Sequence, residues 1–195
     1  GNIDRGAVVK HYQSGATIIF PQINLAIDEL ANFCRNLEFE LSCKVQTNVY
    51  LTPKNSQGFK THYDDHDVFI LQIHGKKNWN LYQQAVERPF RGEPFDSSEH
   101  EAGKLDLNFT MEPGDCLYIP RGYMHDATNA GNEPSLHITV GLLVKKWADL
   151  MIEVLSEVAL NNSEFRESLP VGFAKKDFDA SNARVYFRKL VETFS

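Results

Sequence analysis

Two histidines and an aspartate, in two separate stretches of the chain, have the residue types and spacing of a metal site. His62 and Asp64 stand two positions apart in the stretch THYDDHDVFILQIHGKKNW, residues 61–79. On an extended strand, residues i and i+2 point to the same face, which predicts an imidazole and a carboxylate side by side. Two histidines and one carboxylate suit non-haem Fe(II), because three protein ligands leave three coordination positions open. The pair alone is weak evidence, since surface His and Asp fall at this spacing by chance.

A second stretch supplies a candidate third ligand. GDCLYIPRGYMHDATN, residues 114–129, has the form G-x5-P-x4-H-x3-N. Gly114 suits a tight turn into a strand, and Pro120 marks the end of that strand. A short turn that contains glycine then places His125 on the next strand. Such a strand pair can bring His125 into the same barrel mouth as the first two candidates.

Taken together, the two stretches resemble a known family. The second stretch has the pattern of the second cupin motif, and SQGFKTHYDDHDVFILQIHGKKNW with PGDCLYIPRGYMHDATN is similar to the JmjC-type 2-oxoglutarate oxygenases, especially the ribosomal-oxygenase branch often labelled cupin-4. The resemblance covers about residues 45–145. It implies a double-stranded β-helix that binds Fe(II) through His62, Asp64 and His125. It also implies a reaction that decarboxylates 2-oxoglutarate to succinate while a substrate C–H bond is hydroxylated.

Lys77 is the candidate anchor for 2-oxoglutarate, whose distal carboxylate needs a cation inside the barrel. The segment HGKKNW, residues 74–79, is typical of a hairpin turn. Lys76 and Lys77 must face opposite sides of the strand, and Lys77 shares its side with Trp79, which is expected to point inward. The resemblance places the family's cosubstrate-binding Lys or Arg at this position. Without the metal ligands a solvated hairpin lysine would be the better interpretation, because Lys is rarely buried.

Several other polar residues are candidates for the same pocket. Asn48 and Tyr50 alternate onto one strand face, where the resemblance implies hydrogen bonds to 2-oxoglutarate, but a polar interior would suit them equally well. Thr139 and His137 form a similar pair on a late strand and are expected to line the pocket, although a structural histidine fits as well. On a regular strand His66 would share the face of the first two ligands, either as an alternative ligand or as a group at the rim.

The remaining pattern indicates a mainly β domain followed by helices. Strand patterns lie at residues 43–51, 67–74, 105–111, 116–119 and 136–144, after an amphipathic helix at 24–37. Residues 86–104 form a long polar loop of the kind that often covers a binding site. After residue 145 the apolar period changes from 2 to 3.6, which predicts helices at 147–158 and 181–194.

We therefore expect two parts. Residues 1–145 are predicted to form a JmjC or cupin barrel, a double-stranded β-helix of jelly-roll type, with an N-terminal helix. Residues 146–195 are predicted to form a helical region that packs on the barrel or joins two chains in a homodimer.

Composition narrows the function classes. A net charge of −6 and a pI near 5.6 argue against broad binding to nucleic acid or to an anionic membrane, because both need a basic face. The three cysteines form no CxxC pair, which favours a reducing compartment and hence the cytoplasm. No apolar run is long enough to span a bilayer, and the first residues lack the apolar segment of a signal peptide. The chain begins at Gly1 rather than Met, so we expect a fragment of a longer protein, which leaves open whether flanking domains such as a winged helix are missing.

The leading hypothesis is an Fe(II)- and 2-oxoglutarate-dependent dioxygenase that hydroxylates a protein side chain, by analogy one on a ribosomal protein. A methyl-lysine demethylase is the alternative within the same chemistry, because hydroxylation of an N-methyl group gives an unstable hemiaminal. A metal-binding cupin without 2-oxoglutarate chemistry and an assembly protein that depends on its C-terminal helices belong to other classes. An inward-facing Lys77 favours the oxygenase over the plain cupin.

Overall fold

The computed structural model describes residues 3–90, 93–129 and 131–194, and the chain divides into two compact units, Gly1–Val144 and Lys145–Ser195. The first unit contains α1 (Arg5–Gln13), β1 (Ile18–Phe20), η1 (Ile23–Leu25), α2 (Asp28–Leu41), β2 (Lys44–Thr52), β3 (Ser56–Gln57), β4 (Asp67–His74), β5 (Lys77–Gln84), β6 (Leu105–Met111), β7 (Cys116–Ile119), β8 (Tyr123–Asn129) and β9 (Ser135–Leu143). The second contains α3 (Trp147–Asn161), η2 (Ser163–Arg166) and α4 (Ser181–Phe194). No described helix is both long and apolar enough to cross a membrane.

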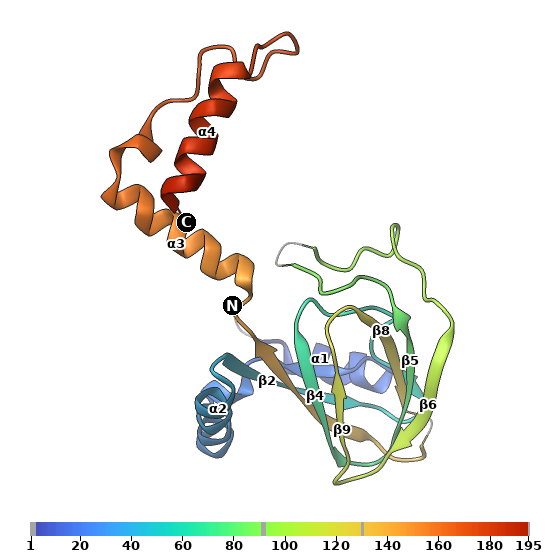
Figure 1. Ribbon diagram of the computed structural model, residues 1–195. Coiled ribbons are helices and arrows are strands. Elements are labelled where there is room, and N and C mark those ends of the chain that lie inside the picture. The colour runs from blue at the N-terminus through green and yellow to red at the C-terminus, as the bar shows by residue number, and fades with distance from the viewer. Residues whose placement is uncertain (1–2, 91–92, 130, 195) are drawn as a thin grey trace. The chain divides into compact units, whose positions relative to one another are not determined.

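The strands of the first unit form two antiparallel sheets that wrap into a barrel (Figure 1). One sheet has the strand order β1-β2-β9-β4-β7 and the other has the order β3-β8-β5-β6. From β4 onward the chain passes back and forth between the sheets, with β4, β7 and β9 in the first and β5, β6 and β8 in the second. Two sheets linked in this way are a jelly roll, so the predicted double-stranded β-helix is confirmed.

The apolar run at residues 68–71 shows why β4 forms. Val68 and Ile70 belong to the core cluster between the two sheets, together with Trp79 of β5. Phe69 and Leu71 point to the opposite side, where they pack with the cluster that α2 forms over the first sheet. Because both faces of β4 are covered, the strand is a continuous apolar run rather than an alternating one.

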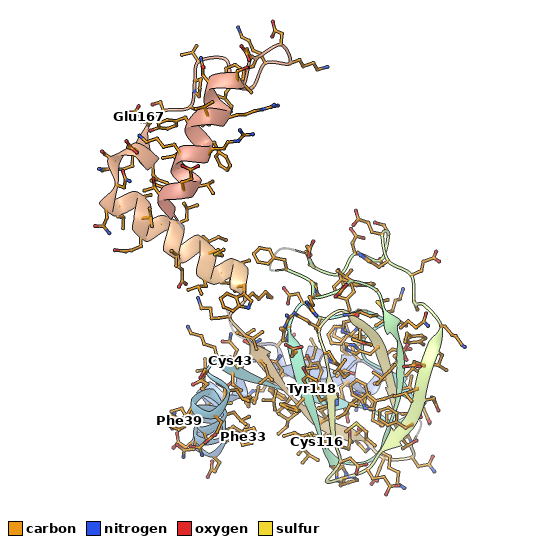
Figure 2. All side chains as sticks on the ribbon, viewed as in Figure 1. Phe33, Phe39, Cys43, Cys116, Tyr118 and Glu167 are labelled. Carbon is orange, nitrogen blue, oxygen red and sulfur yellow. The ribbon has the colours of Figure 1, made fainter. Side chains whose placement is uncertain are left out.

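Helix α2 covers the outer face of the first sheet. Cys34 of the helix and Cys43, just before β2, are buried in that cluster, whereas Phe33 and Phe39 project outward from α2 (Figure 2). The helix begins at Asp28, four residues later than the predicted start at residue 24. Asn24 is held outside the helix because its side-chain oxygen accepts hydrogen bonds from the backbone N–H and the hydroxyl of Thr47, at 3.0 and 3.2 Å.

The interpretation of HGKKNW as a hairpin turn is wrong. Strand β4 pairs with β7 and β9, and β5 pairs with β6 and β8, so the two strands that flank Gly75 lie in different sheets. The segment is a corner that carries the chain from one sheet to the other. The sequence spacing of a hairpin and of such a corner is the same, and only the pairing of distant strands separates them.

Helix α1 was not predicted, because it has no buried residue and therefore no apolar stripe.

Gly122 provides a stability test of the turn that begins β8. Its φ is 84°, and a Cβ there would lie 2.0 Å from the carbonyl oxygen of Val86, whereas Gly114 has a φ of 100° with open space around it. We expect Gly114→Ala to lower the free energy of unfolding by about 1–2 kcal/mol through backbone strain alone. Gly122→Ala should lower it clearly more, because the backbone of residue 86 must also move. Urea unfolding measures both, and equal losses would contradict the packing described for Gly122.

Candidate metal centre and cosubstrate pocket

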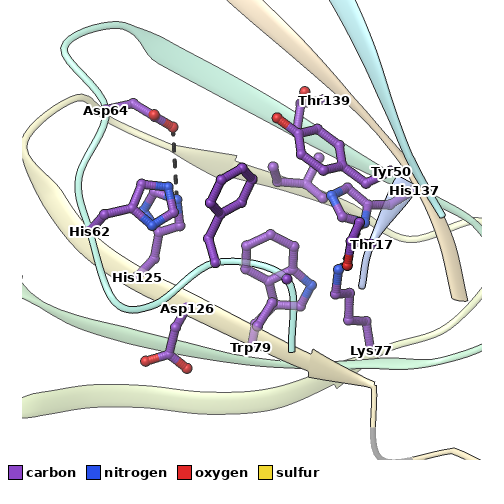
Figure 3. Close-up of a pocket in the computed structure, with 14 residues that line it drawn as sticks. Thr17, Tyr50, His62, Asp64, Lys77, Trp79, His125, Asp126, His137 and Thr139 are labelled. Atoms are coloured by element: carbon purple, nitrogen blue, oxygen red, sulfur yellow. Dashed lines mark hydrogen bonds and ion pairs between the residues drawn. The ribbon is translucent and has the colours of Figure 1, made fainter. Parts of the chain in front are cut away.

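Three candidate metal ligands converge at one end of a pocket inside the barrel (Figure 3). His62, Asp64 and His125 each offer one ligand atom, and these atoms all lie within 4.8 Å of one another. The Nε2 atom of His125 is 3.8 Å from a carboxylate oxygen of Asp64, and the rings of His62 and His125 have their centroids 4.6 Å apart. The structure thus brings the three side chains together, and their action as metal ligands stays a prediction.

Backbone pairing places the two histidines opposite each other. The N–H of His62 donates to the carbonyl of His125 at 3.1 Å, and the N–H of His125 donates to the carbonyl of His62 at 2.8 Å. Strand β4 begins only at Asp67, so the expectation that His62 and Asp64 lie on one regular strand is wrong. His62 sits in an isolated bridge and Asp64 in the loop that follows. That loop is fixed because the N–H of Gly122 donates to the carbonyl of Asp64 at 3.0 Å.

Each histidine is oriented by a carbonyl of its own segment. The Nδ1 atom of His62 lies 2.8 Å from the carbonyl oxygen of Lys60, and the Nδ1 atom of His125 lies 3.0 Å from that of Tyr123. A carbonyl can only accept, so Nδ1 carries the proton and Nε2 keeps its lone pair for a metal. Metal-binding histidines typically donate their other N–H in this way.

The donor set fits a divalent metal such as Fe(II). Burial lowers the pKa of His125, and the neighbouring Asp64 only partly offsets that effect, so the imidazole is neutral at physiological pH. Two imidazole nitrogens and one carboxylate oxygen on one side of the ion would leave its other side open toward the pocket.

A buried carboxylate behind the metal ligands ties their two segments together. Asp126 accepts hydrogen bonds from the hydroxyls of Thr61 and Tyr82, at 2.7 and 2.8 Å, and from the side-chain amide of Asn80 at 2.8 Å. Thr61 adjoins His62, and Asp126 adjoins His125. The network therefore holds the neighbours of both histidines. The partners of Asp126 come from two distant segments, one at Thr61 and one in β5, so no local pattern in the sequence identifies Asp126.

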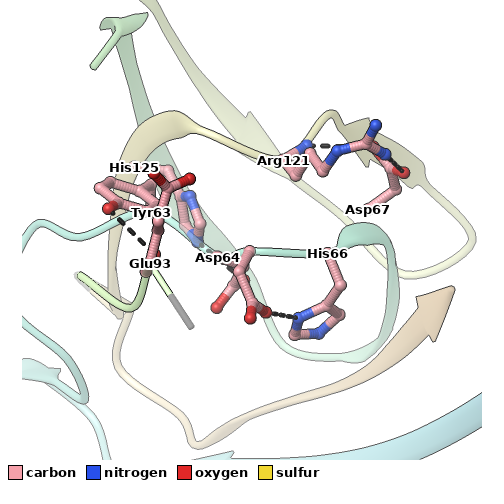
Figure 4. A network of polar contacts seen from close by, with 8 residues as sticks. Tyr63, Asp64, His66, Asp67, Glu93, Arg121 and His125 are labelled. Carbon is pink, nitrogen blue, oxygen red and sulfur yellow. Dashed lines mark hydrogen bonds and ion pairs between the residues drawn. The ribbon is translucent and has the colours of Figure 1, made fainter. Parts of the chain in front are cut away.

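An ion pair and a tyrosine fix the surroundings of Asp64 (Figure 4). Arg121 donates through Nη1 to Asp67 at 2.8 Å and through its backbone N–H to the same carboxylate at 3.0 Å, which fastens the turn before β8 to the start of β4. Tyr63 is buried between the first two candidate ligands, and its hydroxyl donates to the carbonyls of Glu93 and Pro94, at 3.3 and 3.4 Å. The predicted polar loop at 86–104 is thus held to this segment through its described residues.

Lys77 lies at the other end of the pocket. It is 4% exposed, and its Nζ donates to the hydroxyl of Thr52 at 3.1 Å and to Nδ1 of His137 at 3.3 Å. Among the described residues no carboxylate lies within ion-pair distance of it. Burial lowers the pKa of Lys77 to about 8. Burial, followed by the charge of Lys77, lowers the pKa of His137 well below its usual value, so His137 is neutral and accepts through Nδ1.

A buried cation with only neutral partners suits an anionic ligand. Taking a charge out of water is costly unless an opposite charge replaces the lost hydration. A carboxylate bound beside Lys77 would provide that charge, so the pocket fits a dicarboxylate that reaches from Lys77 to the metal ligands. The inward orientation deduced from the shared strand face of Lys77 and Trp79 agrees with the burial of both side chains.

Of the other residues that the sequence suggested for the pocket, some line it and others do not. Tyr50, His137 and Thr139 line the pocket, and the rings of Tyr50 and His137 stack with centroids 4.8 Å apart. Asn48 is not among the lining residues, because its side-chain oxygen accepts the backbone N–H of Gln22 at 2.9 Å. His66 stays outside the metal cluster of the described residues. Its Nδ1 lies 3.1 Å from Asp65, and its ring packs against the glycine at position 141.

A wider, open groove adjoins the pocket on the other side of His62. Its lining includes Phe59, Lys60, His62, Phe95, His100 and Glu101. His62 and Phe59 border both spaces. Nothing in the sequence spacing pointed to His100, whose ring lies 5.2 Å from that of Tyr63 and 6.2 Å from that of Phe95.

Comparisons with known proteins agree with this geometry. A family model described as "JmjC domain" matches residues 21–150. The chain is 39% identical over 170 residues to a protein of Dictyostelium discoideum named "Bifunctional lysine-specific demethylase and histidyl-hydroxylase NO66", which covers 84% of this chain and 33% of that protein. It is 37% identical over 166 residues to "Ribosomal oxygenase 2" of Bos taurus, which covers 84% of this chain and 36% of that protein.

Solved structures show the same fold. The crystal structure of the ribosomal oxygenase YcfD of Escherichia coli superposes with a TM-score of 0.62 at 16% identity, covering 91% of this chain and 46% of that one. The chain spans about a third of the length of the two curated relatives named above. The family model covers most of the first unit, including both stretches that carry the candidate ligands. The chain therefore belongs to the JmjC domain family.

Proposed function

We propose that the chain forms the catalytic barrel of an Fe(II)- and 2-oxoglutarate-dependent dioxygenase that hydroxylates a protein side chain. The observation that carries the proposal is one pocket with two poles. A three-residue metal face lies at one end, and a buried lysine that lacks a carboxylate partner among the described residues lies at the other. When bound, Fe(II) and 2-oxoglutarate supply an oxidation that releases succinate and places one oxygen atom in a substrate C–H bond.

The chain's own residues bind and orient these groups. His62 and His125 would hold the metal through Nε2, and Asp64 through a carboxylate oxygen. Lys77 would hold the distal carboxylate of 2-oxoglutarate, beside Tyr50 and Thr139. Apolar side chains of Ile70, Trp79 and Ala127 complete the wall and keep water away from the bound groups.

The nature of the substrate is proposed from the names of the relatives. Proteins named as histidyl-hydroxylases and as a ribosomal oxygenase act on polypeptides, so a protein side chain, by analogy one on a ribosomal protein, is the proposed target. The name of the Dictyostelium protein also includes a lysine-specific demethylase activity, which makes methyl-lysine demethylation the second candidate. The open groove beside His62 has room for a peptide segment to reach the metal face.

Two further features belong to the proposal. Apolar side chains are exposed on α3, among them Trp147, Met151 and Leu155, and we propose that they form a homodimer contact. The three cysteines are free, which is consistent with the proposed cytoplasmic location. A metal-binding cupin without 2-oxoglutarate chemistry is the less favoured function, because the inward Lys77 would have no ligand there.

Removal of a metal ligand tests the proposed reaction. We expect His62→Ala to reduce Fe(II)-dependent conversion of 2-oxoglutarate to succinate by more than about 100-fold, since loss of a group that merely orients a ligand typically costs 10- to 100-fold. His66→Ala is the matched control, because His66 is a nearby histidine outside the metal cluster, and it should keep its turnover. Wild-type protein that makes no succinate and binds no 2-oxoglutarate would rule out the function.

The charge of Lys77 sets the pH dependence of cosubstrate binding. Because the pKa of Lys77 is lowered to about 8, the affinity for 2-oxoglutarate should fall as the pH rises above that value. His137 is neutral over this range, so it adds no titration of its own. Calorimetry on metal-loaded protein without oxygen measures the affinity. Lys77→Met should bind about 10- to 100-fold more weakly with no such fall, whereas Lys76→Met should behave like wild type.

The same substitution should stabilise the fold. A pKa of about 8 instead of 10.5 means that the charged form of Lys77 costs about 3 kcal/mol in the folded protein at pH 7. The unfolded chain binds more protons between these two values, so wild-type stability should rise from pH 8 to 10.5. In Lys77→Met the free energy of unfolding at pH 7 should increase by up to that amount, while exposed Lys76→Met changes it by less than about 0.5 kcal/mol. Loss of stability in Lys77→Met would contradict a buried, unpaired charge.

A further inference from the structure

One buried hydrogen-bond donor in the pocket has no acceptor. Among the described residues three buried side-chain atoms lack a partner, in Gln72, Trp79 and Arg121, and Trp79 is the one of these residues that lines the pocket. Its side chain is 4% exposed. An indole N–H can only donate, and buried donors in folded proteins are nearly always paired. The free N–H of Trp79 therefore indicates an acceptor that occupies the pocket when the site is filled.

The neighbours of this N–H indicate what the acceptor is. Trp79 and Lys77 lie two positions apart on β5 and are both buried on the inner face of the barrel. Figure 3 shows the indole nitrogen on the edge of the ring nearer Lys77 than His62. The ring of Trp79 also meets that of His137 edge-on, with centroids 5.7 Å apart, and His137 contacts the ammonium of Lys77. The unpaired donor and the unpaired cation thus face one region of the pocket.

We propose that Trp79 is a cosubstrate-binding residue whose indole N–H donates to the same carboxylate that Lys77 binds. This inference rests on the proposed function. It adds to the cosubstrate-binding residues a tryptophan that also packs in the hydrophobic core. A carboxylate has two oxygens, so one can accept from the ammonium of Lys77 while the other accepts from the indole N–H. The pair would fix the plane of the carboxylate as well as its position. It would thereby direct the other end of 2-oxoglutarate toward His62, Asp64 and His125.

The chain offers a simple spectroscopic test, because it contains two tryptophans, Trp79 and Trp147. Trp147 belongs to the second unit and is 82% exposed. Protein labelled with ¹⁵N-tryptophan gives two indole N–H signals, and Trp147→Phe identifies the one from Trp79. On saturation of protein loaded with diamagnetic Zn(II) with 2-oxoglutarate, we expect the Trp79 signal to move downfield and its exchange with solvent to slow. The Trp147 signal should stay in place.

Two further ligands locate the acceptor. Succinate contains the distal carboxylate and should move the Trp79 signal in the same direction. Oxalate reproduces only the end of 2-oxoglutarate that faces the metal, so it should leave the signal nearly unchanged. An equal response to oxalate, or no response to saturating 2-oxoglutarate, would overturn the assignment. These measurements use the native Trp79, so they do not depend on how a variant of Trp79 folds.

Affinities complete the test. Trp79→Phe keeps an aromatic ring but removes the donor, and it should weaken 2-oxoglutarate binding about tenfold or more, as expected for a hydrogen bond to a charged group. Trp147→Phe should bind like wild type. If wild type binds and Lys77→Met does not, while Trp79→Phe binds as tightly as wild type, the role of Trp79 is refuted and the proposed function stands. If wild type binds no 2-oxoglutarate, both fail together.

Discussion

The pair of backbone hydrogen bonds between His62 and His125 is the constraint on which the site depends. The two residues lie far apart in the sequence, and no regular strand carries His62, so these bonds set how closely the two backbones approach. Contacts on either side keep the bridge closed. Asp126 binds Thr61 on one side, and Gly122 binds Asp64 on the other. With each Nδ1 held by a local carbonyl, the metal face is ordered before any ion binds, which lowers the entropic cost of binding one.

The opposite end of the pocket follows a different physical rule. Lys77 extends from one sheet and contacts Thr52 and His137 of the other, so the cation lies between the two sheets. All its partners are neutral, and the protein bears the cost of a desolvated charge. That cost makes sense for binding rather than for folding, because an anion that enters the pocket meets a cation that has already lost its water. The fold therefore carries an energetic cost at the position where the proposed function needs a carboxylate to bind.

Local signals in the sequence predicted most of the strands and identified the three residues that converge. The bounds of β4 and β7 follow from apolar runs ended by Gly75 and Pro120, and the inward face of Lys77 follows from its spacing to Trp79. The features that the sequence did not predict depend on contacts with residues far away in the chain. The corner at Gly75 resembles a hairpin until the pairing of β4 and β5 with other strands is known. Asn48 lies on the same strand face as Tyr50, as predicted, but its side-chain oxygen accepts a hydrogen bond from the backbone N–H of Gln22. The sequence predicted that Trp79 points inward but could not reveal that its indole N–H has no acceptor among the described residues.

The two spaces that His62 borders would have different roles in the proposed reaction. The cosubstrate pocket is walled by both sheets, whereas the groove beyond His62 is open and is bordered by the loop that Tyr63 holds. A protein substrate is too large to enter the pocket between the sheets, so its target side chain must approach the metal face from the groove. The shared border of the two spaces, formed by His62 and Phe59, is where the proposed cosubstrate and the proposed polypeptide would meet.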